Sequence, residues 1–97
     1  MTVVWSDEAK ADYDDNIDYL LKFWTETEAL AFIDEADLTL EMLKTMPTMF
    51  PISDYKNIRK SVVCKQINML YQVSEDEIFL VRFWNNYQNP DKLKALK

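Results

Sequence analysis

The chain has 97 residues, a formal net charge of −6, and neither glycine nor histidine. A chain of this length accommodates one core, so we expect a single domain over residues 1–97. Without glycine the phosphate-binding loop and the dinucleotide-binding fingerprint are excluded, and without histidine the Ser-His-Asp triad and imidazole metal sites are excluded, so no metal or other cofactor is expected.

The first predicted element is a strand over residues 2–5, which are β-branched or aromatic. Ser6 follows as a helix N-cap, and the carboxylates of Asp7 and Glu8 complement the positive end of a helix dipole. The helix that begins there carries apolar residues at spacings of three and four, which places them on one face. They are Ala9, Tyr13, Ile17, Leu20 and Trp24.

A second helix is predicted to begin at Thr25, which forms a capping box with Glu28, and to end before Pro47. The joint between the two helices is short, so they form a hairpin. The inward stripe of the second helix comprises Ala29, Ile33, Ala36, Leu40 and Leu43. Residues 46–54 then form a connector.

Beyond the connector the apolar period changes from helical to extended. Residues 58–63, 65–73 and 77–84 are predicted strands. The polar run 74–76 supplies the turn between the last two. The predicted fold class is α+β: one strand, a helical hairpin and a three-stranded antiparallel meander, with both helices on one face of an antiparallel sheet.

Cys64 is the only cysteine, so no internal disulfide can form. A lone cysteine is typical of a reducing compartment, and its valine-flanked strand predicts a buried, inert thiol. Charged residues follow closely on the first few residues, and no apolar run approaches the roughly 18 residues of a membrane span. We therefore expect a cytoplasmic protein without a membrane partner.

The last predicted strand is apolar on both sides. Side chains of a strand alternate between its two sides. One side carries Phe79, Val81 and Phe83, and the other carries Ile78, Leu80, Arg82 and Trp84. Because two helices can cover only one face, the second face needs another cover. Either residues 85–97 fold back over it or a partner protein binds it. The predicted partner-binding residues are Phe79, Val81, Phe83, Lys60 and Lys65.

Charge is divided unevenly along the chain. Residues 1–50 carry twelve carboxylates and three lysines, a balance of −9, whereas residues 51–97 carry eight cations and five carboxylates, a balance of +3. This division indicates either a bipolar molecule with a basic binding face or two solvated faces. The helical carboxylates are likewise either a contact surface for a basic partner or a solubilising exterior.

Short motifs occur in order along nearly the whole chain. They are Val4-Trp5-Ser6-Asp7-Glu8-Ala9, Ile17, Tyr19-Leu20 and Trp24, then Leu43, Met46-Pro47, Pro51 and Ile58-Arg59-Lys60, then Leu70-Tyr71, Val81-Arg82 and Gln88-Asn89-Pro90-Asp91-Lys92-Leu93. In this order and spacing they resemble the RelE/ParE superfamily, the toxins of bacterial type II toxin-antitoxin (plasmid stabilisation) modules. The fold predicted above is the fold of that superfamily.

This resemblance implies a growth-inhibiting toxin held inactive, in an oligomeric complex, by a cognate antitoxin that wraps over it. Such an antitoxin would account for the uncovered apolar face. ParE-like members block DNA gyrase by protein contact, whereas RelE-like members cut messenger RNA in the ribosomal A site without a metal. A member that has lost toxicity and serves as a binding module is a third alternative.

Metal-free RNA cleavage needs a base, an acid and a cation beside the phosphate. Here Arg59 or Arg82 can supply the cation, and Tyr87 can act as the acid or stack on a base. RelE-like members often have arginine where this chain has Tyr87, and a net charge of −6 opposes binding to ribosomal RNA. The sequence therefore favours gyrase binding over an enzymatic activity, with ribosome-dependent cleavage as the alternative.

Overall fold

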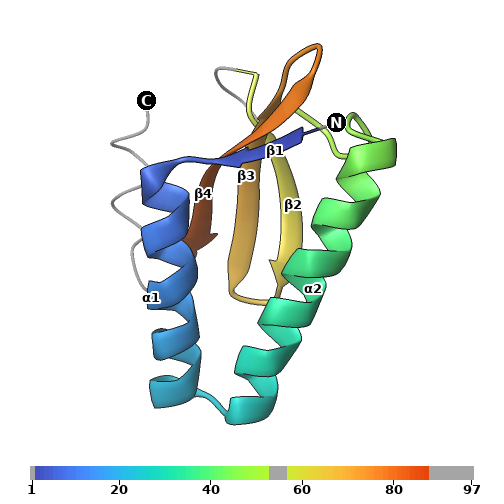
Figure 1. The fold of residues 1–97 in the computed structure, drawn as a ribbon. Helices are drawn as coiled ribbons and strands as arrows, with labels where there is room; N and C mark the ends of the chain where they lie inside the picture. Colours follow the sequence, from blue (N-terminus) through green and yellow to red (C-terminus); the bar gives the residue numbers. More distant parts are fainter. Residues whose placement is uncertain (1, 53–56, 88–97) are drawn as a thin grey trace.

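A computed structural model describes residues 2–52 and 57–87. Its elements are strand β1 (Thr2–Trp5), helices α1 (Asp7–Phe23) and α2 (Glu26–Thr45), and strands β2 (Arg59–Cys64), β3 (Ile67–Val73) and β4 (Glu77–Asn85). Figure 1 shows the helical hairpin on one side of a four-stranded sheet. The predicted α+β class, with its helical hairpin and meander, is confirmed.

The strands lie in the order β1-β4-β3-β2. The meander pairs are antiparallel, but β1 pairs parallel with β4, with Thr2 opposite Glu77 and Trp5 opposite Leu80. The prediction of a wholly antiparallel sheet is therefore wrong for β1. Parallel pairing requires a long crossover connection, which the helical hairpin and the first two meander strands provide.

Side-chain caps fix the start of each helix where the sequence predicted it. The Ser6 hydroxyl accepts the backbone N–H of Ala9 at 2.9 Å, and the Thr25 hydroxyl accepts that of Glu28 at 3.1 Å. Each cap satisfies an N–H group that has no partner within the helix. No helix in the described ranges is both long and apolar enough to cross a membrane.

The main core lies between the helices and the sheet. Phe83, 1% exposed, contacts the rings of Trp5, Tyr13 and Phe32 at centroid distances of 5.3, 5.5 and 5.7 Å. The other members of the two predicted helical stripes lie in this core or pack against it. Trp24 is the exception at 40% exposed, because α1 ends at Phe23 and Trp24 is its C-cap.

A β-bulge in β4 alters the predicted alternation. Tyr71 pairs with Leu80 while Leu70 pairs with Arg82, so Val81 is an extra residue in the strand. The bulge reverses the side-chain direction beyond it, and Phe83 joins Leu80 on the helix side. The prediction that Phe83 shares an uncovered face with Phe79 and Val81 is therefore wrong.

The β2–β3 hairpin also differs from the prediction. Cys64 pairs with Ile67, so Lys65 and Gln66 form a two-residue turn and Lys65 does not begin a strand. The predicted connection between β3 and β4 is confirmed. There the backbone N–H of Ser74 donates to the carbonyl oxygen of Glu77 at 2.9 Å.

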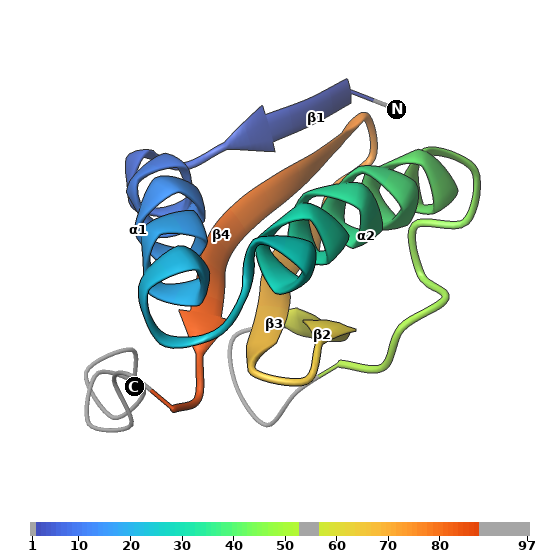
Figure 2. The same cartoon turned by 90° about the horizontal axis from the view of Figure 1, so that it is seen from below.

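Helix α1 continues along the edge of β4 beyond the point where β1 stops, as Figure 2 shows. The Ser6 hydroxyl donates to the carbonyl of Val81 at 2.7 Å. The Asp12 carboxylate accepts the N–H of Phe83 at 3.1 Å, and the Asn16 amide donates to the Phe83 carbonyl at 3.0 Å. Three side chains thus take over the edge hydrogen bonds that a neighbouring strand would make.

Replacing Asn16 tests this edge contact. Asn16 is 2% exposed, and Asn16→Ala leaves the Phe83 carbonyl buried without its donor. We expect the free energy of unfolding to fall by about 2 kcal/mol in urea denaturation followed by circular dichroism. The matched control is Asp15→Ala on the exposed side of α1, which should change stability by less than about 0.5 kcal/mol. Equal losses in the two variants would contradict the edge contact.

Candidate functional site

The sheet face opposite the helices, here called the outer face, holds some of the predicted site residues. Its centre is a second apolar cluster of Ile58, Leu70 and Trp84, each 5% exposed or less, with Val81 packed against it. Lys60 is exposed and pairs with Leu70 across the strands, which places both side chains on this face. The outer face therefore combines an apolar centre with an exposed cation.

Arg82 lies in the same cross-strand row as Lys60 and Leu70, but its guanidinium contacts α1. Its Nε donates to Asp12 Oδ2 at 2.6 Å and its Nη2 to Asp12 Oδ1 at 2.9 Å. The two side chains are only 18% and 14% exposed. The hydrogen bond to Asp12 raises the pKa of Arg82 further above its usual range. The guanidinium is charged, but its charge is already compensated.

Arg59, the other strand arginine, is held at the opposite edge of the sheet. Its Nη1 donates to the carbonyl of Phe50 at 2.7 Å, and its backbone forms a bridge with Ile52. Both partners belong to the connector that runs beside β2, the edge strand. Arg59 therefore anchors the connector, while Arg82 anchors α1 beyond β4.

Tyr87 follows β4 and is 55% exposed. Its ring lies 6.3 Å from that of Trp24, in the joint between the helices, and its N–H donates to Asn85 Oδ1 at 2.9 Å. The three predicted nuclease residues thus have separate surroundings: Arg59 at the connector, Arg82 on α1, and Tyr87 against Trp24. The structure does not bring them together around one phosphate-sized space.

The predicted partner-binding residues are also divided. Phe79 and Val81 are half-buried, Lys60 is exposed on β2, and Lys65 is exposed in the β2–β3 turn. Phe83 lies in the main core, where no partner can reach it. Residues 88–97, which include most of the segment predicted to fold back and the Gln88 to Leu93 motif, lie outside the described residues.

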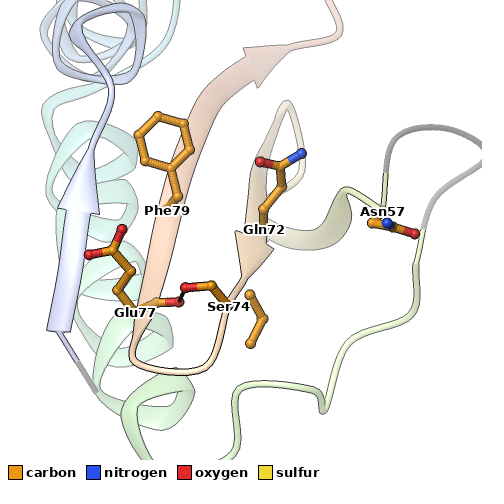
Figure 3. Close-up of a pocket in the computed structure, with 6 residues that line it drawn as sticks. Asn57, Gln72, Ser74, Glu77 and Phe79 are labelled. Carbon is orange, nitrogen blue, oxygen red and sulfur yellow. Dashed lines mark hydrogen bonds between the residues drawn. The ribbon is translucent and has the colours of Figure 1, made fainter.

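A shallow hollow of about 430 Å³ opens beside the β3–β4 connection (Figure 3). It is lined by Asn57, Gln72, Val73, Ser74, Glu77 and Phe79. Gln72 and Phe79 are cross-strand partners, so their side chains reach the hollow from the same side of the sheet. Among the described residues that line it, Glu77 is the ionisable one. The hollow is suited to receiving a partner's side chain.

The sequence predicts a buried thiol, and Cys64 is half-buried. Burial raises the pKa of the thiol, and its Sγ donates to Gln66 Oε1 at 3.4 Å. A raised pKa leaves little thiolate at neutral pH, which disfavours nucleophilic chemistry. Within residues 2–52 and 57–87, no group of three or more Cys, Asp or Glu side chains is placed to hold a metal ion.

Sequence reasoning did not single out Asp12 and Asn16. They lie four residues apart and therefore on one flank of α1, beside its apolar stripe. The only signal in the sequence is a polar pair at helical spacing next to core positions such as Tyr13 and Ile17. Polar helical residues are usually exposed, so this signal does not reveal that a strand edge needs their hydrogen bonds.

Comparison with known proteins shows which family the chain belongs to. Residues 3–90 match the family of the ParE toxin of the type II toxin-antitoxin system parDE. The chain belongs to the ParE toxin family. It is a type II toxin of the RelE/ParE superfamily, as the sequence motifs indicated. A search of curated proteins found no match.

Solved structures of toxins share the fold of this ParE-family chain. The chromosomal ParDE system from P. aeruginosa is 18% identical with a TM-score of 0.71, over 88% of this chain and 95% of that one. The YoeB/ParE toxin from Agrobacterium tumefaciens is 16% identical with a TM-score of 0.63, over 88% and 98%. The DinJ-YafQ complex from E. coli is 12% identical with a TM-score of 0.58, over 88% and 92%.

The Asp12–Arg82 pair can be tested by a double-mutant cycle. Asp12→Asn leaves the guanidinium of Arg82 without its carboxylate, so we expect a loss of about 2 kcal/mol in the free energy of unfolding. The variant Asp12→Asn with Arg82→Gln has no unpaired charge and should lose less than the sum of the single variants. Strictly additive losses would show that the two side chains do not interact.

The Cys64 thiol is expected to react slowly in the folded protein. Burial both raises its pKa and limits access, so alkylation by iodoacetamide near pH 8 should be about ten times slower than in denaturing urea. Mass spectrometry of the intact chain measures both rates, because Cys64 is the only cysteine. Equal rates would overturn the description of an inert thiol.

Proposed function

We propose that this ParE-family toxin inhibits growth by binding a protein target, DNA gyrase, and that a cognate antitoxin neutralises it in an oligomeric complex. The observation that carries the proposal is the engagement of both strand arginines by the chain's own acceptors. Arg82 bonds to Asp12 and Arg59 to the Phe50 carbonyl, at opposite edges of the sheet.

Cleavage of RNA would require a cation at the phosphate as negative charge develops. For Arg82 to serve there, it would have to leave a largely buried, doubly hydrogen-bonded carboxylate. Asp12 would then remain close to the incoming phosphate and repel it. The net charge of −6 adds a general repulsion from ribosomal RNA. These costs favour action by protein contact.

The outer face has features suited to protein contact. Phe79 and Val81 are half-buried there, and the hollow beside Phe79 can receive a partner's side chain. Lys60 supplies a positive charge next to the apolar cluster. A partly exposed apolar surface with a polar rim is the usual composition of a binding interface. We assign this surface to the antitoxin, since covering it would bury the exposed parts of Phe79 and Val81.

Inducible expression tests the proposal. Expression of the toxin alone should stop growth, and co-expression of the neighbouring antitoxin gene should restore it. Arrested cells should contain relaxed plasmid, because gyrase no longer introduces supercoils. Messenger RNA with new 5′-hydroxyl ends at A-site codons would favour the ribosome-dependent alternative. Absence of arrest in both strains would favour a binding module without toxicity.

Variants distinguish contact from catalysis. Growth arrest should survive Tyr87→Phe, Arg59→Lys and the charge-neutral Asp12→Asn/Arg82→Gln double variant, because none of these side chains would act on RNA. Loss of arrest in the double variant, with its fold retained by circular dichroism, would support cleavage. Phe79→Ala should weaken antitoxin binding about tenfold in calorimetry, whereas Leu38→Ala on the far side of α2 should not.

A further inference from the structure

Aromatic side chains gather at the end of α1, where Tyr19 also packs against the main core. The ring centroids of Tyr19 and Phe23 are 5.2 Å apart. The indole Nε1 of Trp24 donates a weak hydrogen bond to the Tyr19 hydroxyl at 3.5 Å, and its ring lies 6.3 Å from that of Tyr87. These contacts join Tyr19, Phe23, Trp24 and Tyr87 into one continuous surface, here called the end patch.

The end patch is open to solvent. Phe23 is 62% exposed, Tyr87 55% and Trp24 40%. Trp5 and Trp84, by contrast, pack against the two apolar clusters of the fold. Exposed tryptophan and tyrosine rings that pack against one another are typical of the centres of protein interfaces.

Carboxylates adjoin the end patch. Asp15 precedes Tyr19 by one helical turn, Asp18 lies one turn beyond Asp15, and Glu26 opens α2 just after Trp24; all three are exposed. Lys22 adds one cation, and its Nζ already lies 5.3 Å from the centre of the Phe23 ring. The patch is therefore an aromatic surface in acidic surroundings, which attracts cations.

The preceding turn of α1 already binds one guanidinium in this way. Arg82 is held by the carboxylate of Asp12, and its guanidinium carbon lies 5.5 Å from the Trp84 ring. Asp15 lies three residues beyond Asp12, beside Tyr19, and repeats the pairing of carboxylate and ring farther along the helix.

The chain has no third arginine for this second position. Arg59 and Arg82 are its only arginines, and both guanidiniums are engaged elsewhere. A guanidinium at the end patch must therefore come from another molecule. Residues 1–50 carry twelve carboxylates and three lysines, so their negative electrostatic potential attracts a basic segment.

We propose that the end patch binds an arginine-bearing basic segment of a partner protein. The guanidinium stacks on the rings of Trp24 and Tyr87, and the carboxylates of Asp15 and Asp18 bind its charge. This surface is separate from the hollow beside Phe79, and the proposal holds independently of the assignment of gyrase as target.

The experiment uses a defined probe, an acetylated and amidated nine-residue peptide with four arginines among alanine and leucine. A matched peptide carries citrulline in place of each arginine, which keeps the planar shape and removes the charge. Titration is followed by the indole N–H signals in ¹H–¹⁵N NMR spectra at about 50 mM salt, where screening is weak. We expect the Trp24 signal to shift most, and the citrulline peptide to bind about tenfold more weakly.

Variants at the patch and away from it decide the outcome. Trp24→Ala and Tyr87→Ala should each weaken binding about tenfold, and Asp15→Asn with Asp18→Asn about fivefold. The matched controls on α2 should stay within about twofold; they are Met42→Ala, also 40% exposed, and Asp34→Asn with Asp37→Asn, which removes the same charge.

The proposal is overturned by any of three results. In the first, the citrulline peptide binds as well as the arginine peptide. In the second, the α2 charge control weakens binding as much as the Asp15 and Asp18 variant, which would indicate general attraction to an acidic protein. In the third, both aromatic variants keep their fold and bind normally. Because Trp24 and Tyr87 lie on different segments, the test survives if one variant fails to fold.

Discussion

The contact between one flank of α1 and the edge of β4 is the constraint on which the rest of the structure depends. β1 pairs with β4 only as far as Leu80, and the strand edge beyond would expose unpaired backbone groups. Side chains of Ser6, Asp12 and Asn16 bond those groups instead. The helix must therefore follow the direction of β1, and the hairpin that it begins lies over the sheet. The contacts that close the β4 edge therefore also place the helical hairpin over the sheet.

The same contact governs which chemistry the outer face can perform. Asp12 accepts the Phe83 N–H and two N–H groups of Arg82, so the carboxylate that closes the edge also engages the guanidinium. Among the residues that the structure describes, Lys60 is an exposed cation of the outer face. Partly exposed apolar surfaces with a polar rim, such as this face, recognise proteins more readily than they stabilise a phosphorane. The contact that stabilises the fold is thus also the one that engages the Arg82 guanidinium.

Local patterns in the sequence predicted most of the fold, because caps and periodicity act over a few residues. Ser6 and Thr25 start their helices through bonds three residues away. The failures involve contacts distant in sequence. Phe83 lies in the core because a bulge at Val81, set by pairing with β3, reverses the strand faces. Candidate site residues could be chosen from their side-chain chemistry. Whether such a side chain is free to bind a ligand depends on partners distant in sequence, as Asp12 lies about seventy residues from Arg82.

We propose that this toxin acts by contact with a protein and does not cleave RNA. The most direct measurement adds the purified chain to two reconstituted systems, gyrase acting on relaxed plasmid and ribosomes translating a defined message. We expect that supercoiling is inhibited, that the message stays intact, and that equimolar antitoxin reverses the inhibition. Unimpaired supercoiling together with cleavage of the message at the A site would contradict it.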